Sequence, residues 1–233
     1  MMGSRVKKLG RAFVLGSAML SGMEALLPPE WAQAIGVSAT THALTVFVTN
    51  EAFLPGTAPG LLSGVADADQ KCQDRAAAAA LSGTYKAWLS ADTAEPEEAA
   101  TRLRHWTGPY TLVDQTVVAD SWTDLTDGSL DHAIDRDEFG NPTSGVPVWT
   151  GTTPAGAVTA DNTCGWWFSS VGTGRRGTSS ATDGTWTSVA DGDCSTLAHL
   201  YCFEECPDLD QDTFCDGSAS TSTSESSTTT TST

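Results

Sequence analysis

Short runs of apolar and β-branched residues, many of them alternating with polar positions, recur along most of the chain and predict a largely β fold. Two stretches have helical character instead. Residues 65–81 carry Asp67 and Asp69 in the predicted first turn and then an alanine run, and residues 95–103 have Pro96 near their start. Strands are predicted at residues 44–49, 85–90, 111–113, 116–119 and 146–150, and a further apolar run ends at residues 202–203. This order predicts an α+β domain with a mainly antiparallel sheet, one or two helices and long loops.

Residues 1–34 have the three parts of an export signal. Basic residues come first, residues 12–23 are apolar, and Ala32-Gln33-Ala34 supplies the small residues that precede a cleavage site. The apolar run is too short to span a bilayer. A buried N-terminal helix is the alternative interpretation. We expect removal of the signal and a protein that is secreted or held at the cell surface.

The composition changes after the last apolar run. Residues 44–204 form the predicted domain, and residues 205–216 form an acidic loop that contains Cys206 and Cys215. Residues 217–233 consist almost wholly of Ser and Thr. Such a tail cannot bury enough apolar surface to offset the entropy of ordering it, so we expect it to be disordered. It is predicted to be a spacer or an O-glycosylated stalk.

The chain is strongly acidic, with 29 Asp and Glu against 12 Lys and Arg and a formal net charge of −17. Four of the basic residues lie in the predicted signal, and the others form no basic stripe. Nucleic acid and anionic membrane surfaces are therefore not expected as partners. An extracellular protein or glycan is the partner that we expect, without a further identity.

Six cysteines behind an export signal predict disulfides rather than metal thiolates. Many pairings are open on the sequence alone. The step from Cys194 to Cys202 suits one cysteine on a loop and one on the strand that follows, so that each has a different partner. A bridge between Cys206 and Cys215 would close the acidic loop.

Several segments carry a family likeness. Residues 64–90 resemble the helix-then-strand entry of endostatin, the C-terminal domain of collagens XV and XVIII, and residues 148–156 and 194–203 resemble the second half of that family. The chain resembles still more closely a bacterial secreted family, known as a domain of unknown function, that shares the endostatin-like form. Residues 122–128 (Trp-Thr-Asp-Leu-Thr-Asp-Gly) also fit that family. The likeness covers residues 44–204.

The resemblance implies a C-type-lectin-like fold with nested disulfides, Cys72–Cys202 and Cys164–Cys194, an arrangement that the cysteine spacing also favours. Two ligand sites of related proteins do not carry over. Calcium-dependent lectins of this fold have a carboxylate before the proline of their binding loop, which Asn141-Pro142 lacks. The zinc site and basic heparin-binding face of endostatin have no counterpart in this acidic chain.

Two acidic stretches are candidates for calcium, because oxygen atoms from a flexible loop are the ligands that this ion prefers. The sharper one reproduces the opening spacing of an EF-hand loop without its glycine and distant glutamate, and its ligands would be Asp208, Asp210, Asp212 and Asp216. The second stretch, which could also contact an extracellular ligand, contains Asp131, Asp135, Asp137 and Glu138. The alternatives are an acidic linker and a solvated loop. Calcium is the one candidate cofactor.

The chain has eight tryptophans, most of which must lie in the core of a domain of this size. Trp88, Trp149 and Trp166 are expected to be buried, because they lie in strand-like runs or beside a cysteine. Trp167 and Trp186 have glycine, serine and threonine neighbours and are the expected surface residues. There they could stack on a sugar.

Catalytic motifs are missing from the sequence. It has no Gly-x-Ser-x-Gly elbow, no His-Glu-x-x-His zinc motif and no phosphate-binding glycine loop, and paired cysteines leave no thiol nucleophile. We therefore expect a secreted, non-enzymatic recognition or adhesion module that binds a protein or a glycan through its loops. A structural surface or matrix protein without a discrete ligand is the first alternative. A hydrolase that acts through carboxylates is the second.

Overall fold

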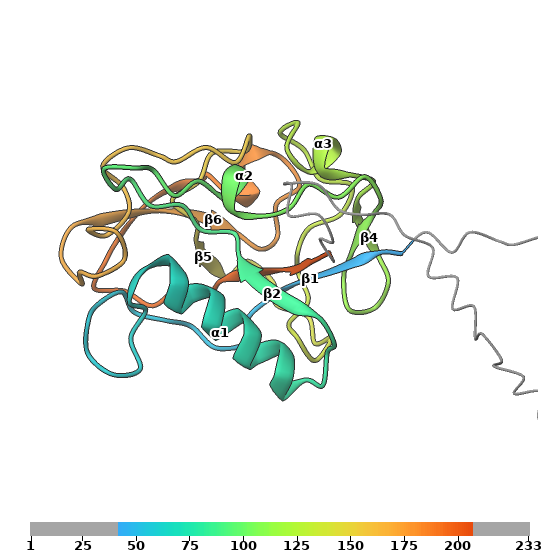
Figure 1. The fold of residues 1–233 in the computed structure, drawn as a ribbon, viewed down its shortest axis with the longest axis horizontal. Helices are drawn as coiled ribbons and strands as arrows, with labels where there is room; N and C mark the ends of the chain where they lie inside the picture. Colours follow the sequence, from blue (N-terminus) through green and yellow to red (C-terminus); the bar gives the residue numbers. More distant parts are fainter. Residues whose placement is uncertain (1–41, 207–233) are drawn as a thin grey trace, which may run out of the picture. The chain divides into compact units, whose positions relative to one another are not determined.

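The computed structural model describes residues 42–206, which belong to one compact unit (Figure 1). Its helices are α1 (Gly64–Ala78), α2 (Ala99–Arg102) and α3 (Trp122–Leu125). Its strands are β1 (Leu44–Val48), β2 (Thr84–Ala87), β3 (Tyr110–Thr111), β4 (Val117–Ala119), β5 (Pro147–Trp149), β6 (Thr173–Thr178), β7 (Ala190–Asp193) and β8 (Tyr201–Glu205). The predicted α+β class with mainly antiparallel sheets is confirmed. No described helix has the length and apolar character needed to cross a bilayer. The predicted signal and the Ser/Thr-rich tail lie outside the described residues.

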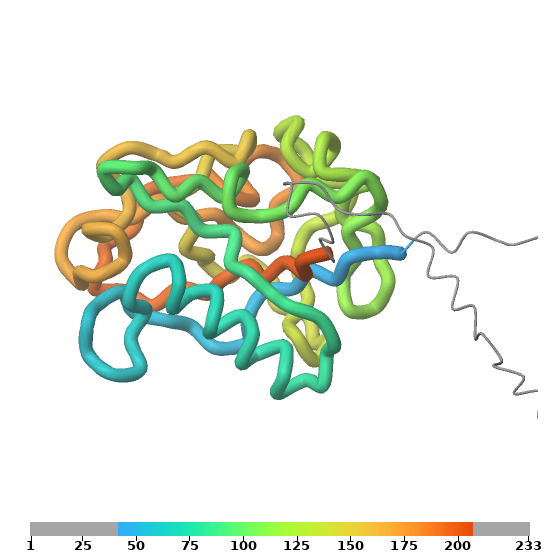
Figure 2. The backbone as a smooth tube through the Cα atoms, viewed as in Figure 1, coloured from blue at the N-terminus to red at the C-terminus, as the bar shows by residue number. Residues whose placement is uncertain are grey.

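The last strand of the described chain lies inside the larger sheet, next to its edge strand β2. The strand order of this sheet is β2-β8-β1-β3-β4, and β5, β6 and β7 form a second sheet. β8 runs antiparallel to both of its neighbours, with Phe203 opposite Val46 on one side and Lys86 on the other. β1 and β3 pair in parallel. Because the first strand pairs with the last, the two ends of the described chain lie side by side (Figure 2).

Helix α1 packs on this sheet through one face of small side chains. Val65, Ala68, Cys72 and Ala76 follow each other at steps of three and four residues and are all buried. Their small size lets α1 approach β2 and β8 closely, and the sulfur of Cys72 is bonded to that of Cys202 in β8 at 2.01 Å. The predicted helix is confirmed, although it ends at Ala78 rather than at residue 81.

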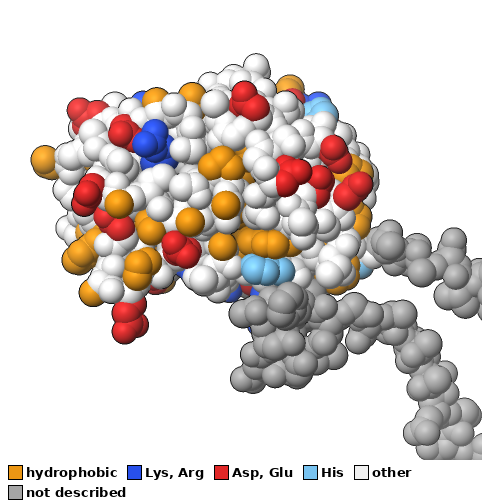
Figure 3. Space-filling model, turned by 90° about the horizontal axis from the view of Figure 1, so that it is seen from above, with side chains coloured by type: hydrophobic (Ala, Val, Ile, Leu, Met, Phe, Trp, Pro, Cys, Tyr) orange, Lys and Arg blue, Asp and Glu red, His pale blue; other side chains and the backbone are white. Residues whose placement is uncertain are grey.

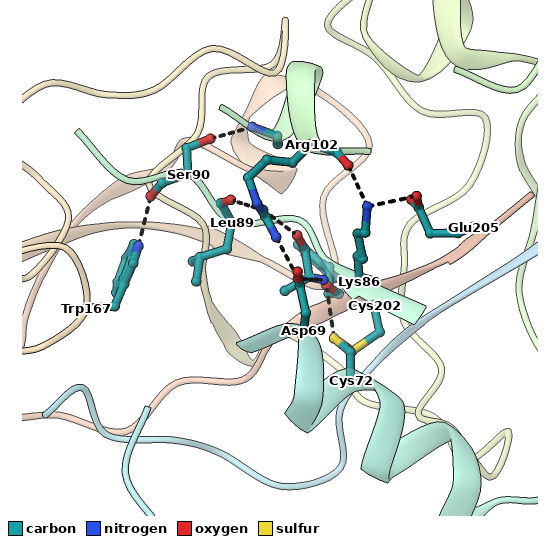
Figure 4. A network of polar contacts seen from close by, with 12 residues as sticks. Asp69, Cys72, Lys86, Leu89, Ser90, Arg102, Trp167, Cys202 and Glu205 are labelled. Atoms are coloured by element: carbon teal, nitrogen blue, oxygen red, sulfur yellow. Dashed lines mark hydrogen bonds and ion pairs between the residues drawn. A yellow bond between two sulfur atoms is a disulfide. The ribbon is translucent and has the colours of Figure 1, made fainter. Parts of the chain in front are cut away.

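A polar network joins α1, β2 and α2 beside this disulfide (Figure 4). The guanidinium group of Arg102 pairs with Asp69 at 2.6 Å and donates a hydrogen bond to the carbonyl oxygen of Leu89, also at 2.6 Å. Lys86 donates to the carbonyl oxygen of Arg102 at 2.8 Å. Partly exposed ion pairs contribute little energy each. Together these contacts tie α2 to α1 and to Leu89, in the segment whose residues Ser90 and Asp92 contact the candidate site.

Side chains of β1 and β8 alternate between two hydrophobic cores, as the two faces of a strand require. Val46 and Phe203 belong to the first core, and Phe47 and Cys202 belong to the second. Each core contains two fully buried tryptophans: Trp88 and Trp186 in the first, Trp149 and Trp167 in the second. The expected burial of Trp88 and Trp149 is confirmed.

Two strands and a helix, β6, β7 and α3, have no counterpart among the predicted elements. The sequences of β6 (Thr-Gly-Arg-Arg-Gly-Thr) and β7 (Ala-Asp-Gly-Asp) are rich in residues that disfavour strands. Close packing explains the glycines: a Cβ at Gly177 would clash with the carbonyl oxygen of Trp186, and one at Gly174 would press on the sulfur of Cys164. Pairing with β5 therefore overrides local preference here.

The helix predicted at residues 95–103 shrinks to α2, and the strand predicted at residues 85–90 ends at Ala87.

The three tyrosines of the chain give the fold a predictable response to alkali. Burial, assisted by the charge of Glu204, raises the pKa of Tyr85 to about 12. Burial also raises the pKa of Tyr110 and Tyr201 above the ordinary value of 10. The folded protein therefore keeps its phenols protonated at a pH where the unfolded chain ionises them, so this part of the stability is complete below pH 10 and is lost as the pH rises toward 12 and beyond.

We expect phenolate absorbance to stay low as the pH rises through 10 and then to increase cooperatively, together with loss of the near-ultraviolet circular dichroism of the fold. Free tyrosine amide, titrated in parallel, marks the ordinary pKa. Ionisation of the three tyrosines around pH 10 in a protein that is still folded would contradict this expectation.

Candidate functional site

The second disulfide organises an exposed loop, residues 163–172, which leads into β6. Cys164 is bonded to Cys194 at 2.07 Å, so both bridges of the predicted nested pair are confirmed. The N–H of Cys194 also donates to the carbonyl oxygen of Gly172, at 3.0 Å, and ties the far end of the loop to the end of β7. The hydroxyl and N–H of Ser195 hold the pKa of neighbouring Asp193 below its ordinary value. Cys206 is disulfide-bonded too, but its predicted partner Cys215 lies outside the described residues.

Within this loop the backbone makes a left-handed turn. The φ angles are 50°, 56°, 60° and 68° at Cys164, Gly165, Trp166 and Trp167. A left-handed conformation costs roughly 1–2 kcal/mol for each residue that carries a Cβ, so surrounding contacts must hold such a run in place. The hydrogen bond from the N–H of Trp167 to the carbonyl oxygen of Thr163, at 2.6 Å, is one of these contacts. Strained backbone is concentrated at functional sites, which makes this turn a candidate.

The turn sends two adjacent tryptophans in different directions. Trp167 is fully buried, and its ring N–H donates to the carbonyl oxygen of Ser90 at 2.8 Å (Figure 4). Trp166 is 48% exposed, and its ring N–H donates to the carbonyl oxygen of Asp92 at 3.0 Å. The expected burial of Trp166 and the expected exposure of Trp167 are both wrong. The left-handed turn, rather than the composition around the residues, sets their directions.

Asp92 holds the turn from the opposite side. Its carboxylate accepts hydrogen bonds from the hydroxyl of Thr163 and from the N–H of Asp161, the latter at 2.7 Å. Its carbonyl oxygen holds Trp166, so one residue fixes the loop at three points. Sequence reasoning missed Asp92, because a single acidic residue in an acidic chain carries no signal.

We call this segment, residues 163–172, the aromatic loop. Its outside carries three exposed apolar side chains, Trp166, Phe168 and Val171. Phe168 is 48% exposed and Val171 is 80% exposed. The ring of Phe168 lies over Gly64 at the start of α1, where a Cβ has no room. Figure 3 shows hydrophobic side chains at several places on this face of the molecule, among them the left end. Rigid apolar groups gathered at a surface are typical of interaction sites.

Trp186, the other tryptophan expected at the surface, lies in the core. It ends a short 3₁₀ helix, Gly184–Trp186, and is fully buried. Its ring packs against those of Trp88 and Tyr201, with centroid distances of 5.0 and 5.6 Å. The expectation of surface exposure is therefore wrong, and the small polar neighbours of Trp186 do not mark a surface segment, since Thr187 is buried as well and accepts a hydrogen bond from the ring N–H of Trp88.

The second acidic stretch, residues 131–138, turns two of its carboxylates inward, contrary to the expectation that they face a ligand. Asp137 is buried and accepts hydrogen bonds from the N–H of Phe139 and from the N–H and side chain of Asn141, at 2.8–3.0 Å. These bonds close the loop on itself. Glu138 is buried as well and accepts from the N–H of Asn50 at 2.8 Å and from Arg75 Nε at 2.5 Å.

The other two carboxylates of this loop remain accessible. Asp131 is exposed, and half-buried Asp135 pairs with Arg136 at 2.8 Å. Between residues 42 and 206, no three His, Cys, Asp or Glu side chains are grouped in a way that could hold a metal ion. The predicted calcium ligands Asp208, Asp210, Asp212 and Asp216 lie outside the described residues.

A shallow groove on the face that carries α2 and α3 is a second candidate. Its volume is about 330 Å³, and its lining residues are His105, Trp106, Thr107, Ser121, Trp122 and Thr123. The rings of His105 and Trp122 are stacked, with centroids 4.1 Å apart and planes 13° from parallel. The sequence offered no signal for this groove, because its two walls lie on either side of β3 and β4 and meet where these two strands pair.

The described residues thus form a disulfide-bonded α+β domain with an exposed aromatic loop and an aromatic groove. A scan of protein-family models found none that matches the chain, and a search of curated proteins found no match either.

Proposed function

We propose that the chain is a secreted, non-enzymatic recognition module that binds an extracellular protein or glycan through its aromatic loop. The observation that carries this proposal is the half-exposed Trp166, held in a left-handed turn by a disulfide and by its bond to Asp92. Aromatic side chains that are already fixed lose little entropy when they bind, and they contribute a large contact area.

Several features support the finer part of the proposal, a C-type-lectin-like fold of endostatin-like form. The two disulfides have the nested pairing that the resemblance implies, and the chain ends lie side by side on β1 and β8. The loops between β5 and β6 and between β7 and β8 are long and are tied together by Cys164–Cys194. Disulfides of this kind form in oxidising compartments, which agrees with export.

We expect Trp166→Ala and Phe168→Ala each to weaken ligand binding by about tenfold or more, because truncation of a central aromatic commonly costs about 2 kcal/mol. Glycan and matrix-protein arrays probed with the oxidised protein would find the ligand, and titration would then give the affinities of the variants. Val189→Ser is the matched control, since Val189 is 47% exposed but lies outside the aromatic loop. Retention of full affinity by both aromatic variants would rule out the loop as the binding surface.

Calcium remains a proposed cofactor for residues 208–216. A thermal melt with calcium and with a chelator tests it, since an ion that binds only the folded state raises the Tm. Equal melting temperatures in the two conditions would remove calcium from the proposal.

A further inference from the structure

The ring of Trp166 is held in place but is not covered. It is 48% exposed, and its N–H donates to the carbonyl oxygen of Asp92. Three other rings of the domain, those of Phe53, Phe139 and Trp149, each have a Lys or Arg side chain at 5.0–5.9 Å. Within residues 42–206, the ring of Trp166 has neither a cation over it nor another aromatic ring against it. Trp166 therefore offers a fixed and open ring face to a partner.

Carboxylates lie on the side where this ring is anchored. The carboxylate of Asp92 accepts a hydrogen bond from the N–H of Asp161 at 2.7 Å. Glu97 belongs to the same turn as Asp92, because its N–H and carbonyl oxygen bond to those of Ala91 at 2.9 and 3.0 Å, and Glu95 lies within that turn. Glu95, Glu97 and Asp161 are exposed. These four acidic residues come from two segments that meet at Asp92, and we call them the acidic rim.

The charge of the acidic rim is not balanced within the domain. In the part of the chain that the structure describes, none of its four carboxylates forms an ion pair with Lys or Arg. Arg175, whose N–H bonds to the carbonyl oxygen of Asn162 beside the loop, already lies 3.1 Å from Asp191. An excess of negative charge attracts cationic partners and repels sulfated or uronic-acid glycans. A neutral glycan would leave this charge uncompensated.

From these observations we infer that the aromatic loop binds a cationic segment of an extracellular protein, with a Lys or Arg side chain over Trp166 and further basic residues against the acidic rim. Indole attracts a cation more strongly than the other aromatic side chains do, and the planar guanidinium group of Arg also stacks on its face. The exposed side chains of Phe168 and Val171 would contact apolar groups of the same segment. The inference rests on the proposed function and narrows its partner from a protein or a glycan to a protein with a basic surface.

The test is a titration of the oxidised full chain into labelled dodecapeptides in which Gly alternates with Arg, Gln or Glu, followed by fluorescence anisotropy. The Arg peptide is expected to bind about tenfold more tightly than the Gln peptide, and more weakly as salt is added, because the acidic rim is exposed. Trp166→Ala leaves the charge of the protein unchanged and should weaken the Arg peptide by about fivefold, the effect of a cation–π contact of moderate strength.

The double variant Glu95→Gln/Glu97→Gln should also weaken the Arg peptide by about fivefold and reduce the dependence of its affinity on salt. Both side chains are exposed, so this variant carries the test if Trp166→Ala is unstable. Asp120→Asn/Asp131→Asn is the matched control. It removes the same charge from two exposed residues that flank β4, where the N–H of Asp131 bonds to the carbonyl oxygen of Val118 at 2.9 Å, and it should bind the Arg peptide almost as well as the unchanged protein does.

Each other result overturns the inference. A cationic partner is excluded if the Arg peptide does not bind or binds no better than the Gln peptide. Equal losses in the rim variant and in the control variant would show that only the overall charge attracts the peptide, and full binding by Trp166→Ala would place the peptide away from the ring. A neutral glycan that needs Trp166 but not the acidic rim would replace the basic protein as the partner. In that case the inference fails while the proposed function stands, whereas the proposed function fails if the loop variants keep full affinity for every partner found on the arrays.

Discussion

Replacing both Cys72 and Cys202 by alanine is expected to lower the free energy of unfolding by about 5 kcal/mol, a large share of the stability of a single domain. The bridge joins residues 130 positions apart, and in the chain-entropy model the loss of loop closure in the unfolded chain grows with that separation. The bridge also fixes α1 to the interior strand β8, which lies between the first and second strands of the domain. Urea unfolding of the double variant measures the loss.

The inner bridge provides the matched control. Cys164 and Cys194 are 30 positions apart, so their double replacement by alanine should cost less, about 3.5 kcal/mol in the same model. The two variants should also differ in binding, since only the inner bridge supports the aromatic loop. A larger loss of stability from the inner bridge than from the outer one would contradict the prediction.

Arg75→Met should destabilise the protein by about 3–5 kcal/mol, because it leaves a buried carboxylate without its positive partner. The side chain of Glu138 is fully buried, and its carboxylate lies 2.5 Å from Arg75 Nη2 as well as from Nε. Arg75 is 20% exposed and also reaches the side chains of Asn50 and Glu51, so it can be solvated when Glu138 is absent. We therefore expect Glu138→Gln to cost clearly less than Arg75→Met.

The two substitutions together sharpen this test. Gln at position 138 carries no charge and can still accept the bond from the N–H of Asn50. The double variant Arg75→Met/Glu138→Gln should consequently be more stable than Arg75→Met alone, although a second group has been changed. Urea unfolding of the four proteins gives the coupling energy. Additive losses would show that the buried charge is not the cause.

The tryptophans show where local reasoning succeeds and where it fails. Trp88 and Trp149 lie in or next to apolar strand runs, and a strand with one face on a core buries such residues wherever the sheet is placed. The directions of Trp166, Trp167 and Trp186 depend instead on tight turns. In a tight turn, a shift of the backbone by one residue exchanges the side chain that faces the core with the one that faces the solvent. The local composition does not show which of the two arrangements forms.

The acidic residues show the same division. The charge of the chain predicts many exposed carboxylates, and most of those described are at least partly exposed. Which two turn inward could not be predicted, because burial of Glu138 depends on Arg75, a residue of a helix 63 positions earlier. Likewise, the groove needs the segments at residues 105–107 and 121–123 to meet, and the pairing of β3 with β4, the backbone bond between Trp106 and Trp122 and the stacking of His105 on Trp122 place them together.

By itself, the sequence determined the class of the domain, the position of α1, the first and last strands and the pairing of two disulfides. Each of these follows from a strong local pattern: helix propensity over a whole segment, apolar strand runs, or cysteine spacing read together with a family resemblance. Only the tertiary structure decided that β8 lies between β1 and β2, that the glycine-rich segments become β6 and β7, and that Trp166 rather than Trp167 faces outward. These outcomes depend on contacts between residues far apart in the chain, whose energies outweigh local preferences and leave no periodic trace in the sequence.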